Sequence, residues 1–118
     1  DGTVDLGDVR IVLSLDPKPP VAFAKFRARA QARTSGEGGG PTPLESGRVY
    51  FEMAMPMGDH RYSLPPAADG WHEADVVLPL CASGDRRWFA TVEGVVAGRP
   101  RVARFQLSLA PPRTESSK

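Results

Sequence analysis

The chain concentrates its soft metal-binding side chains in one short stretch. Residues 51–62 hold all three methionines and one of the two histidines. Thioether sulfur is a soft donor that selects Cu(I), and imidazole binds copper in either oxidation state. Met55, Met57 and His60 approach the end of a predicted strand and its turn, which makes them candidate copper ligands. Met53 lies earlier in that strand and is predicted to fill the core, because methionine adapts to irregular gaps.

Cys81 is the fourth candidate ligand and the only cysteine, so the chain cannot form an internal disulfide. The strand that ends at Met57 runs one way, the next returns, and the third brings Cys81 to the same end as Met57 and His60. A thiolate there would complete a soft-metal site, with the ion deprotonating the thiol. The alternative is that Cys81 is a small buried hydrophobe. The same topology places His72 at the opposite end, where we predict a surface residue.

Period-two alternation of apolar and polar side chains predicts the elements that position these residues. Twelve glycines and twelve prolines supply frequent turns between them. The pattern predicts an all-β fold, an immunoglobulin-like β-sandwich of about seven strands in two antiparallel sheets. The predicted strands are residues 9–15, 21–32, 49–57, 60–64, 71–81, 87–96 and 102–109.

Two of these strands carry further expectations. Residues 21–32 have a helical alternative, because alanine and arginine are good helix formers, but their strict alternation favours a strand. Gly94 is predicted to mark a bulge, as an isolated glycine inside a strand often does.

A chain of 118 residues can bury one hydrophobic core. We therefore expect residues 1–118 to form a single domain with an ordered core at about residues 9–110. Residues 33–47 contain five glycines and two prolines without periodicity and are predicted to form a long irregular loop. Residues 111–118 are predicted to be a flexible tail.

Charge and motif content exclude several function classes. Fifteen basic and fourteen acidic residues leave no net basic field, which argues against nucleic-acid binding. No apolar run approaches the roughly 20 residues that a transmembrane helix needs. The sequence has neither a Gly-x-Ser-x-Gly elbow nor a phosphate-binding loop, so we predict that it is not an enzyme.

Two charged patterns are predicted to be solvent-facing. Glu73 and Asp75 share one face of a strand, where a solvated outer surface explains a pair of carboxylates. Lys25, Arg27 and Arg29 form a basic stripe on another strand, which could also dock an acidic partner.

Several short motifs resemble the YtkA-like domain, a family related to the FixH accessory proteins. They are Met53-Ala-Met-Pro-Met-Gly-Asp-His60, Asp69-Gly70-Trp71, Leu78-Pro-Leu-Cys81, Ser83-Gly84, Trp88 and Phe105-Gln-Leu-Ser-Leu109. The resemblance covers about residues 9–109. It implies an exported or membrane-tethered immunoglobulin-like sandwich with a link to copper handling or respiratory-oxidase assembly. The chain departs from the family at Cys81, where a methionine is more usual, and in the insertion 85–87.

Two functional hypotheses follow from these observations. The first is a non-enzymatic periplasmic module that binds copper, preferably Cu(I), through Met55, Met57, His60 and Cys81 and meets an envelope protein partner. The second is a structural or protein-interaction module without metal, in which the methionines are core packing. The chain opens at Asp1 without an initiator methionine, which suggests a preceding secretory signal or membrane tether.

Overall fold

The described part of the chain forms regular structure only as β-strands. The computed structural model describes residues 2–35, 39–53, 60–65, 70–79 and 87–110. In chain order the strands are β1 (Gly2–Asp5), β2 (Val9–Asp16), β3 (Phe26–Thr34), β4 (Pro41–Thr42), β5 (Glu45–Glu52), β6 (Arg61–Ser63), β7 (His72–Val76), β8 (Arg87–Val96) and β9 (Arg99–Ser108). These described residues include no helix, and so none that could cross a membrane. The predicted all-β class is confirmed.

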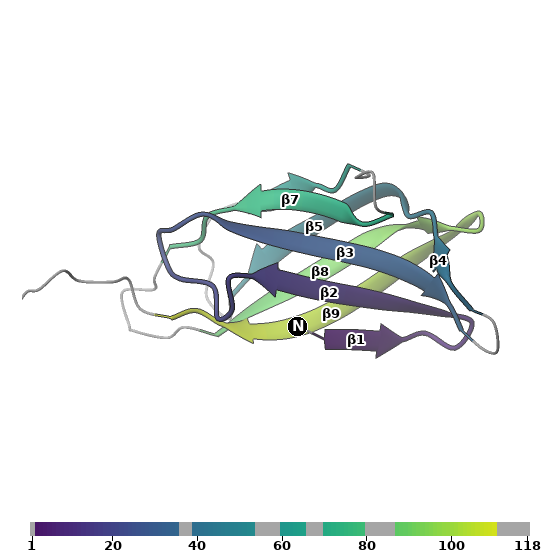
Figure 1. The fold of residues 1–118 in the computed structure, drawn as a ribbon, viewed down its shortest axis with the longest axis horizontal. Coiled ribbons are helices and arrows are strands. Elements are labelled where there is room, and N and C mark those ends of the chain that lie inside the picture. The colour runs from purple at the N-terminus through teal and green to yellow at the C-terminus, as the bar shows by residue number, and fades with distance from the viewer. Residues whose placement is uncertain (1, 36–38, 54–59, 66–69, 80–86, 111–118) are drawn as a thin grey trace, which may run out of the picture.

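Two antiparallel sheets pack face to face as a β-sandwich (Figure 1). In the first sheet β2 lies between β1 and β3, while β4 and β7 both pair with β3. The second sheet has the order β6-β5-β8-β9 and lies behind the first in Figure 1. The predicted sandwich is therefore confirmed, whereas its immunoglobulin-like topology stays a prediction.

Large and small side chains alternate between neighbouring strands in the core. Three of the four buried residues of β2 are paired with fully buried alanines of β3. The pairs are Ile11 with Ala32, Leu13 with Ala30, and Leu15 with Ala28. A strand of small residues leaves room for the large buried rings of the facing sheet, which include Phe51 and Trp88. This period-two burial shows why the alanine-rich segment forms a strand, as its alternation predicts.

The observed strands differ from the prediction mainly where strands are short or polar. Strand β1 pairs with β2 although its residues were expected to precede the ordered core. Residues 33–47, predicted to be one irregular loop, contain the end of β3, all of β4 and the start of β5. Strand β3 begins at Phe26 rather than at Val21. The predicted flexible tail, residues 111–118, lies outside the described residues.

A β-bulge lies in β5, directly across from Gly94 in β8. Glu45 pairs with Val95 and Arg48 pairs with Glu93, so two residues of β5 stand opposite the single residue Gly94. The predicted bulge position, Gly94, is correct along the strand direction, but the extra residue is in the neighbouring strand β5 and not in β8. The glycine is needed because the chain bulges toward it: a Cβ on Gly94 would lie 2.6 Å from the Leu44 side chain.

Candidate functional site

Only one of the four predicted copper ligands can be placed in the structure. His60 lies immediately before β6 and is partly exposed. Met55, Met57 and Cys81 lie outside the described residues. Met53, which was predicted to pack in the core, is partly buried and does pack against it.

His60 is fixed at the edge of the core by its backbone and its ring. Its carbonyl oxygen accepts a hydrogen bond from the Phe51 N–H at 3.0 Å, which joins the end of β5 to the residue that precedes β6. Its imidazole meets the Trp88 indole in an edge-to-face contact, with ring centres 5.5 Å apart and planes at 85°. Trp88 is the second residue of β8 and is fully buried. This contact therefore joins the β5–β6 connection to the start of β8.

The end of β7 reaches the same end of the sandwich from the opposite sheet. The Tyr62 hydroxyl donates a hydrogen bond to the Val77 carbonyl oxygen at 3.2 Å, and the Tyr62 ring packs edge-on against Phe51. Figure 1 shows that β5 and β7 end, and β8 begins, at this end. The flanks of segments 54–59 and 80–86 therefore gather at one end, in agreement with the strand directions predicted from the sequence.

The described residues alone do not assemble a metal site. Within them, no group of three or more histidine, cysteine, aspartate or glutamate side chains is arranged to hold an ion. His60 contributes one imidazole donor beside a rigid indole. The indole Nε1 of Trp88 is buried and finds no hydrogen-bond acceptor among the described residues, which is a costly arrangement in a protein interior.

An exposed apolar pair lies at this same end. Phe23 is 60% exposed, and its N–H donates to the Leu78 carbonyl oxygen at 2.8 Å. Its φ of 65° lies in the left-handed region, which is unfavourable for a residue with a bulky side chain. Val77, next to Leu78, is 46% exposed. The fold therefore holds a strained aromatic residue in contact with solvent beside a second exposed apolar side chain.

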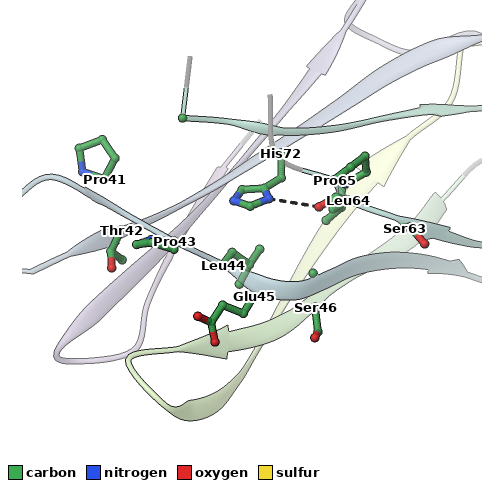
Figure 2. A pocket seen from close by; sticks show the side chains of 12 residues that line it. Pro41, Thr42, Pro43, Leu44, Glu45, Ser46, Ser63, Leu64, Pro65 and His72 are labelled. Atoms are coloured by element: carbon green, nitrogen blue, oxygen red, sulfur yellow. Dashed lines mark hydrogen bonds between the residues drawn. The ribbon is translucent and has the colours of Figure 1, made fainter. Parts of the chain in front are cut away.

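The prediction that His72 is a surface residue is wrong. His72 begins β7 at the end opposite His60, as predicted, but only 6% of it is exposed. Its Nδ1 lies 3.1 Å from the Leu64 carbonyl oxygen (Figure 2). The sequence pattern could have predicted this burial. Successive side chains of a strand point to opposite faces, so His72 points inward if Glu73 and Asp75 point outward.

A pocket of about 780 Å³ lies beside His72. Its walls come from the β4–β5 link, the end of β6 and the start of β7, and they consist mainly of apolar atoms (Figure 2). Alternation of side chains did not predict this pocket, because the segment that forms its longest wall was expected to be an irregular loop. The apolar residues that line it include Pro41, Pro43, Leu44, Leu64 and Pro65.

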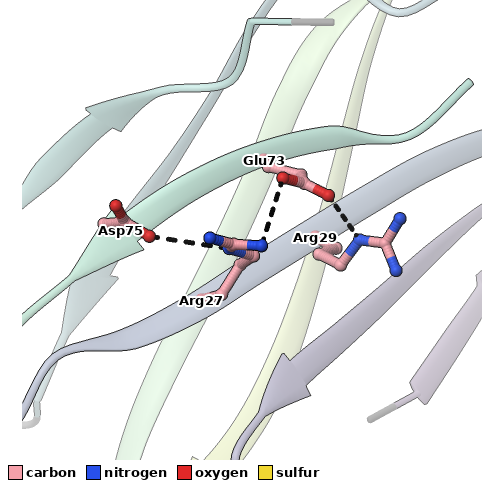
Figure 3. Close-up of polar contacts among 4 residues, drawn as sticks. All are labelled: Arg27, Arg29, Glu73 and Asp75. Carbon is pink, nitrogen blue, oxygen red and sulfur yellow. Dashed lines mark ion pairs between the residues drawn. The ribbon is translucent and has the colours of Figure 1, made fainter. Parts of the chain in front are cut away.

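The two charged patterns predicted on separate strands neutralise each other. Strand β3 pairs with β7 so that Arg29 stands opposite Glu73 and Arg27 opposite Asp75. The Nε of Arg29 lies 2.8 Å from a Glu73 carboxylate oxygen, and Arg27 lies 3.8 Å from Glu73 and 3.7 Å from Asp75 (Figure 3). The Arg29 guanidinium also stacks 4.9 Å from the centre of the Trp71 ring. These arginines thus have acidic partners within their own sheet.

Searches with this chain against protein-family models, curated proteins and solved structures found no match. The resemblance to the YtkA-like domain is therefore neither supported nor contradicted by them, and it remains a prediction.

Proposed function

We propose that this chain is a non-enzymatic, immunoglobulin-like module of the cell envelope that binds Cu(I) at one end of the sandwich. The donors are the His60 imidazole, the Met55 and Met57 thioethers and the Cys81 thiolate, a set of soft ligands that favours Cu(I). The envelope location rests on the resemblance described above. The pairing of β2-β3-β7 in one sheet and β6-β5-β8-β9 in the other is compatible with the immunoglobulin-like topology.

The contact between His60 and Trp88 is the observation that carries this proposal. His60 directly follows the segment that contains Met55 and Met57. Trp88 follows the segment that contains Cys81 by only a few residues. Their rings touch at a centre distance of 5.5 Å, so the fold brings together the flanks of the two segments that hold the other predicted donors.

A protein-interaction module is the second candidate, and the exposed pair of Phe23 and Val77 favours it. Backbone strain in folded proteins clusters at functional sites. A strained, exposed phenylalanine beside an exposed valine at one end of a rigid sandwich would suit the docking of a protein partner. The two candidates are compatible, because a copper carrier must also meet the protein to which it delivers the ion.

A Cu(I) titration against a competing chromophoric chelator tests the proposal. We expect the wild-type protein to bind Cu(I), and the triple variant Met55→Ala, Met57→Ala, His60→Ala to lose that binding while keeping its fold. Met53→Leu is the matched control, because Met53 packs against the core and leucine retains its volume. Far-UV circular dichroism reports on the β-fold of every variant, and unlike Trp88 fluorescence it does not depend on the ring contact that His60→Ala removes.

Three outcomes would contradict the copper hypothesis. The wild type could bind Cu(I) no more tightly than free methionine does. The triple variant could keep the wild-type affinity. The triple variant could unfold while Met53→Leu stays folded and the wild type shows no Cu(I) affinity, which would identify the methionines as core residues.

A further inference from the structure

We propose that the pocket beside His72 binds a small neutral molecule with an apolar body and one hydroxyl group, and that this hydroxyl donates a hydrogen bond to His72 Nε2. The pocket lies at the end of the sandwich opposite His60, so this proposal is independent of copper binding. Its volume of about 780 Å³ lies within the range of small-molecule sites, which are mostly apolar with a few well-placed polar groups.

The hydrogen bond to Leu64 fixes which nitrogen His72 offers to a ligand. A carbonyl oxygen can only accept, so Nδ1 must carry the proton that it donates across 3.1 Å. In the neutral imidazole Nε2 then bears a lone pair and acts as an acceptor. Nε2 has no hydrogen-bond partner among the described residues and points away from Leu64 toward the interior of the pocket (Figure 2). A ligand hydroxyl would satisfy this acceptor, which belongs to a residue that is only 6% exposed.

The charges around the pocket determine the class of ligand. Among the lining residues that the structure describes, only Glu45 carries a formal charge, and its side chain is exposed. The described walls of the pocket therefore offer no cationic side chain to hold a carboxylate or a phosphate. The carboxylate of Glu45 is in contact with water, where it would attract a cation only weakly. A neutral ligand with one hydrogen-bond donor is the chemistry that these walls fit.

The backbone around the pocket shows the irregularity that is common at binding sites. Ser46 lines the pocket with a φ of 53°, in the left-handed region. It lies within the β-bulge of β5, and bulges often occur beside functional sites. The bulge keeps Leu44 buried in the floor, where a Cβ on Gly47 would lie only 3.1 Å from its side chain. The floor is therefore closely packed and preformed rather than collapsible.

Titration with 2-naphthol tests the proposal, and 2-methoxynaphthalene is the matched control ligand. Both have the same apolar rings, but only 2-naphthol can donate a hydrogen bond. We expect 2-naphthol to bind about threefold to tenfold more tightly, since one hydrogen bond contributes about that much. The side-chain nitrogen NMR signal of His72 Nε2 should move when 2-naphthol is added and stay in place with the ether.

A pocket-filling variant locates the binding without disturbing the buried histidine. Ser63 is exposed at the end of β6 and lines the pocket, so Ser63→Trp should abolish 2-naphthol binding. Ser108 is exposed at the end of another edge strand, at the opposite end of the sandwich, and Ser108→Trp should leave the affinity unchanged. The proposal is overturned if the wild type binds neither ligand, if both bind equally, if Nε2 does not respond, or if Ser63→Trp binds like the wild type.

Discussion

Replacing Gly94 with alanine is expected to lower the free energy of unfolding by about 1–2 kcal/mol. The added Cβ would lie 2.6 Å from Leu44 Cδ1 and 3.0 Å from the Glu45 carbonyl oxygen. Leu44 is only 3% exposed, and the Glu45 carbonyl oxygen belongs to the backbone, so both the side chain and the bulged strand must shift to admit the new methyl group. Overpacking costs about 1–3 kcal/mol, whereas alanine in place of glycine restricts the unfolded chain and stabilises by about 0.4–1 kcal/mol. The steric cost is the larger of the two effects.

Urea unfolding followed by tryptophan fluorescence measures this cost, because Trp88 is fully buried in the native protein. Gly40→Ala is the matched control: its Cβ would meet nothing within 4 Å in the described part of the chain. It should be neutral or slightly stabilising. Leu44→Ala should cost less in the Gly94→Ala background than in the wild type, because the new methyl group occupies part of the cavity. If Gly94→Ala were as stable as Gly40→Ala, the close packing of Leu44 would be refuted.

Two further variants test the electrostatics and the backbone. The Arg101 guanidinium lies 2.6 Å from an Asp8 carboxylate oxygen, and its hydrogen bond lowers the pKa of Asp8 below 3.8. Arg101→Gln should therefore raise the pKa of Asp8, which a carboxyl NMR titration measures. Because the folded-state pKa is the lower one, the stability from this pair is present above pH 3.8 and is lost as the pH falls through the folded-state value. Phe23→Gly should change the free energy of unfolding by no more than about 1 kcal/mol, because glycine relieves the left-handed strain and little burial is lost. Phe26→Ala, at a buried ring, should cost about 3–5 kcal/mol in the same urea assay; equal effects at the two positions would contradict this assignment.

The sequence predicted best the strands with one continuously buried face. Residues 9–15 and 87–96 were predicted from alternation and became Val9–Asp16 and Arg87–Val96. Strands β1 and β4 were missed because they are short, lie beside longer strands and bury little. Whether such a short segment forms a strand depends on the strand it pairs with, and the alternation of side chains within the segment does not show that partner.

For the candidate sites too, alternation predicted the course of the strands but not which side chains meet. The sequence correctly predicted that the flanks of 54–59 and 80–86 lie at one end of the sandwich. That prediction required only the number of times the chain reverses direction between the strands. The ion pairs of Arg29 with Glu73 and of Arg27 with Asp75 depend on the register of β3 against β7, which the alternation of either strand leaves open. The pocket beside His72 depends on a bulge, one extra residue in β5, which alternation does not reveal.

The two proposed sites can succeed or fail separately because of how β5 runs. This strand begins at Glu45 beside the pocket and ends at Glu52 near His60, a span of eight residues. At about 3.3 Å per residue the two sites are roughly 20 Å apart. Changes separated by more than about 10 Å without shared partners usually act independently. Loss of copper binding in the triple variant would therefore leave the pocket proposal intact, and loss of 2-naphthol binding in Ser63→Trp would not count against copper.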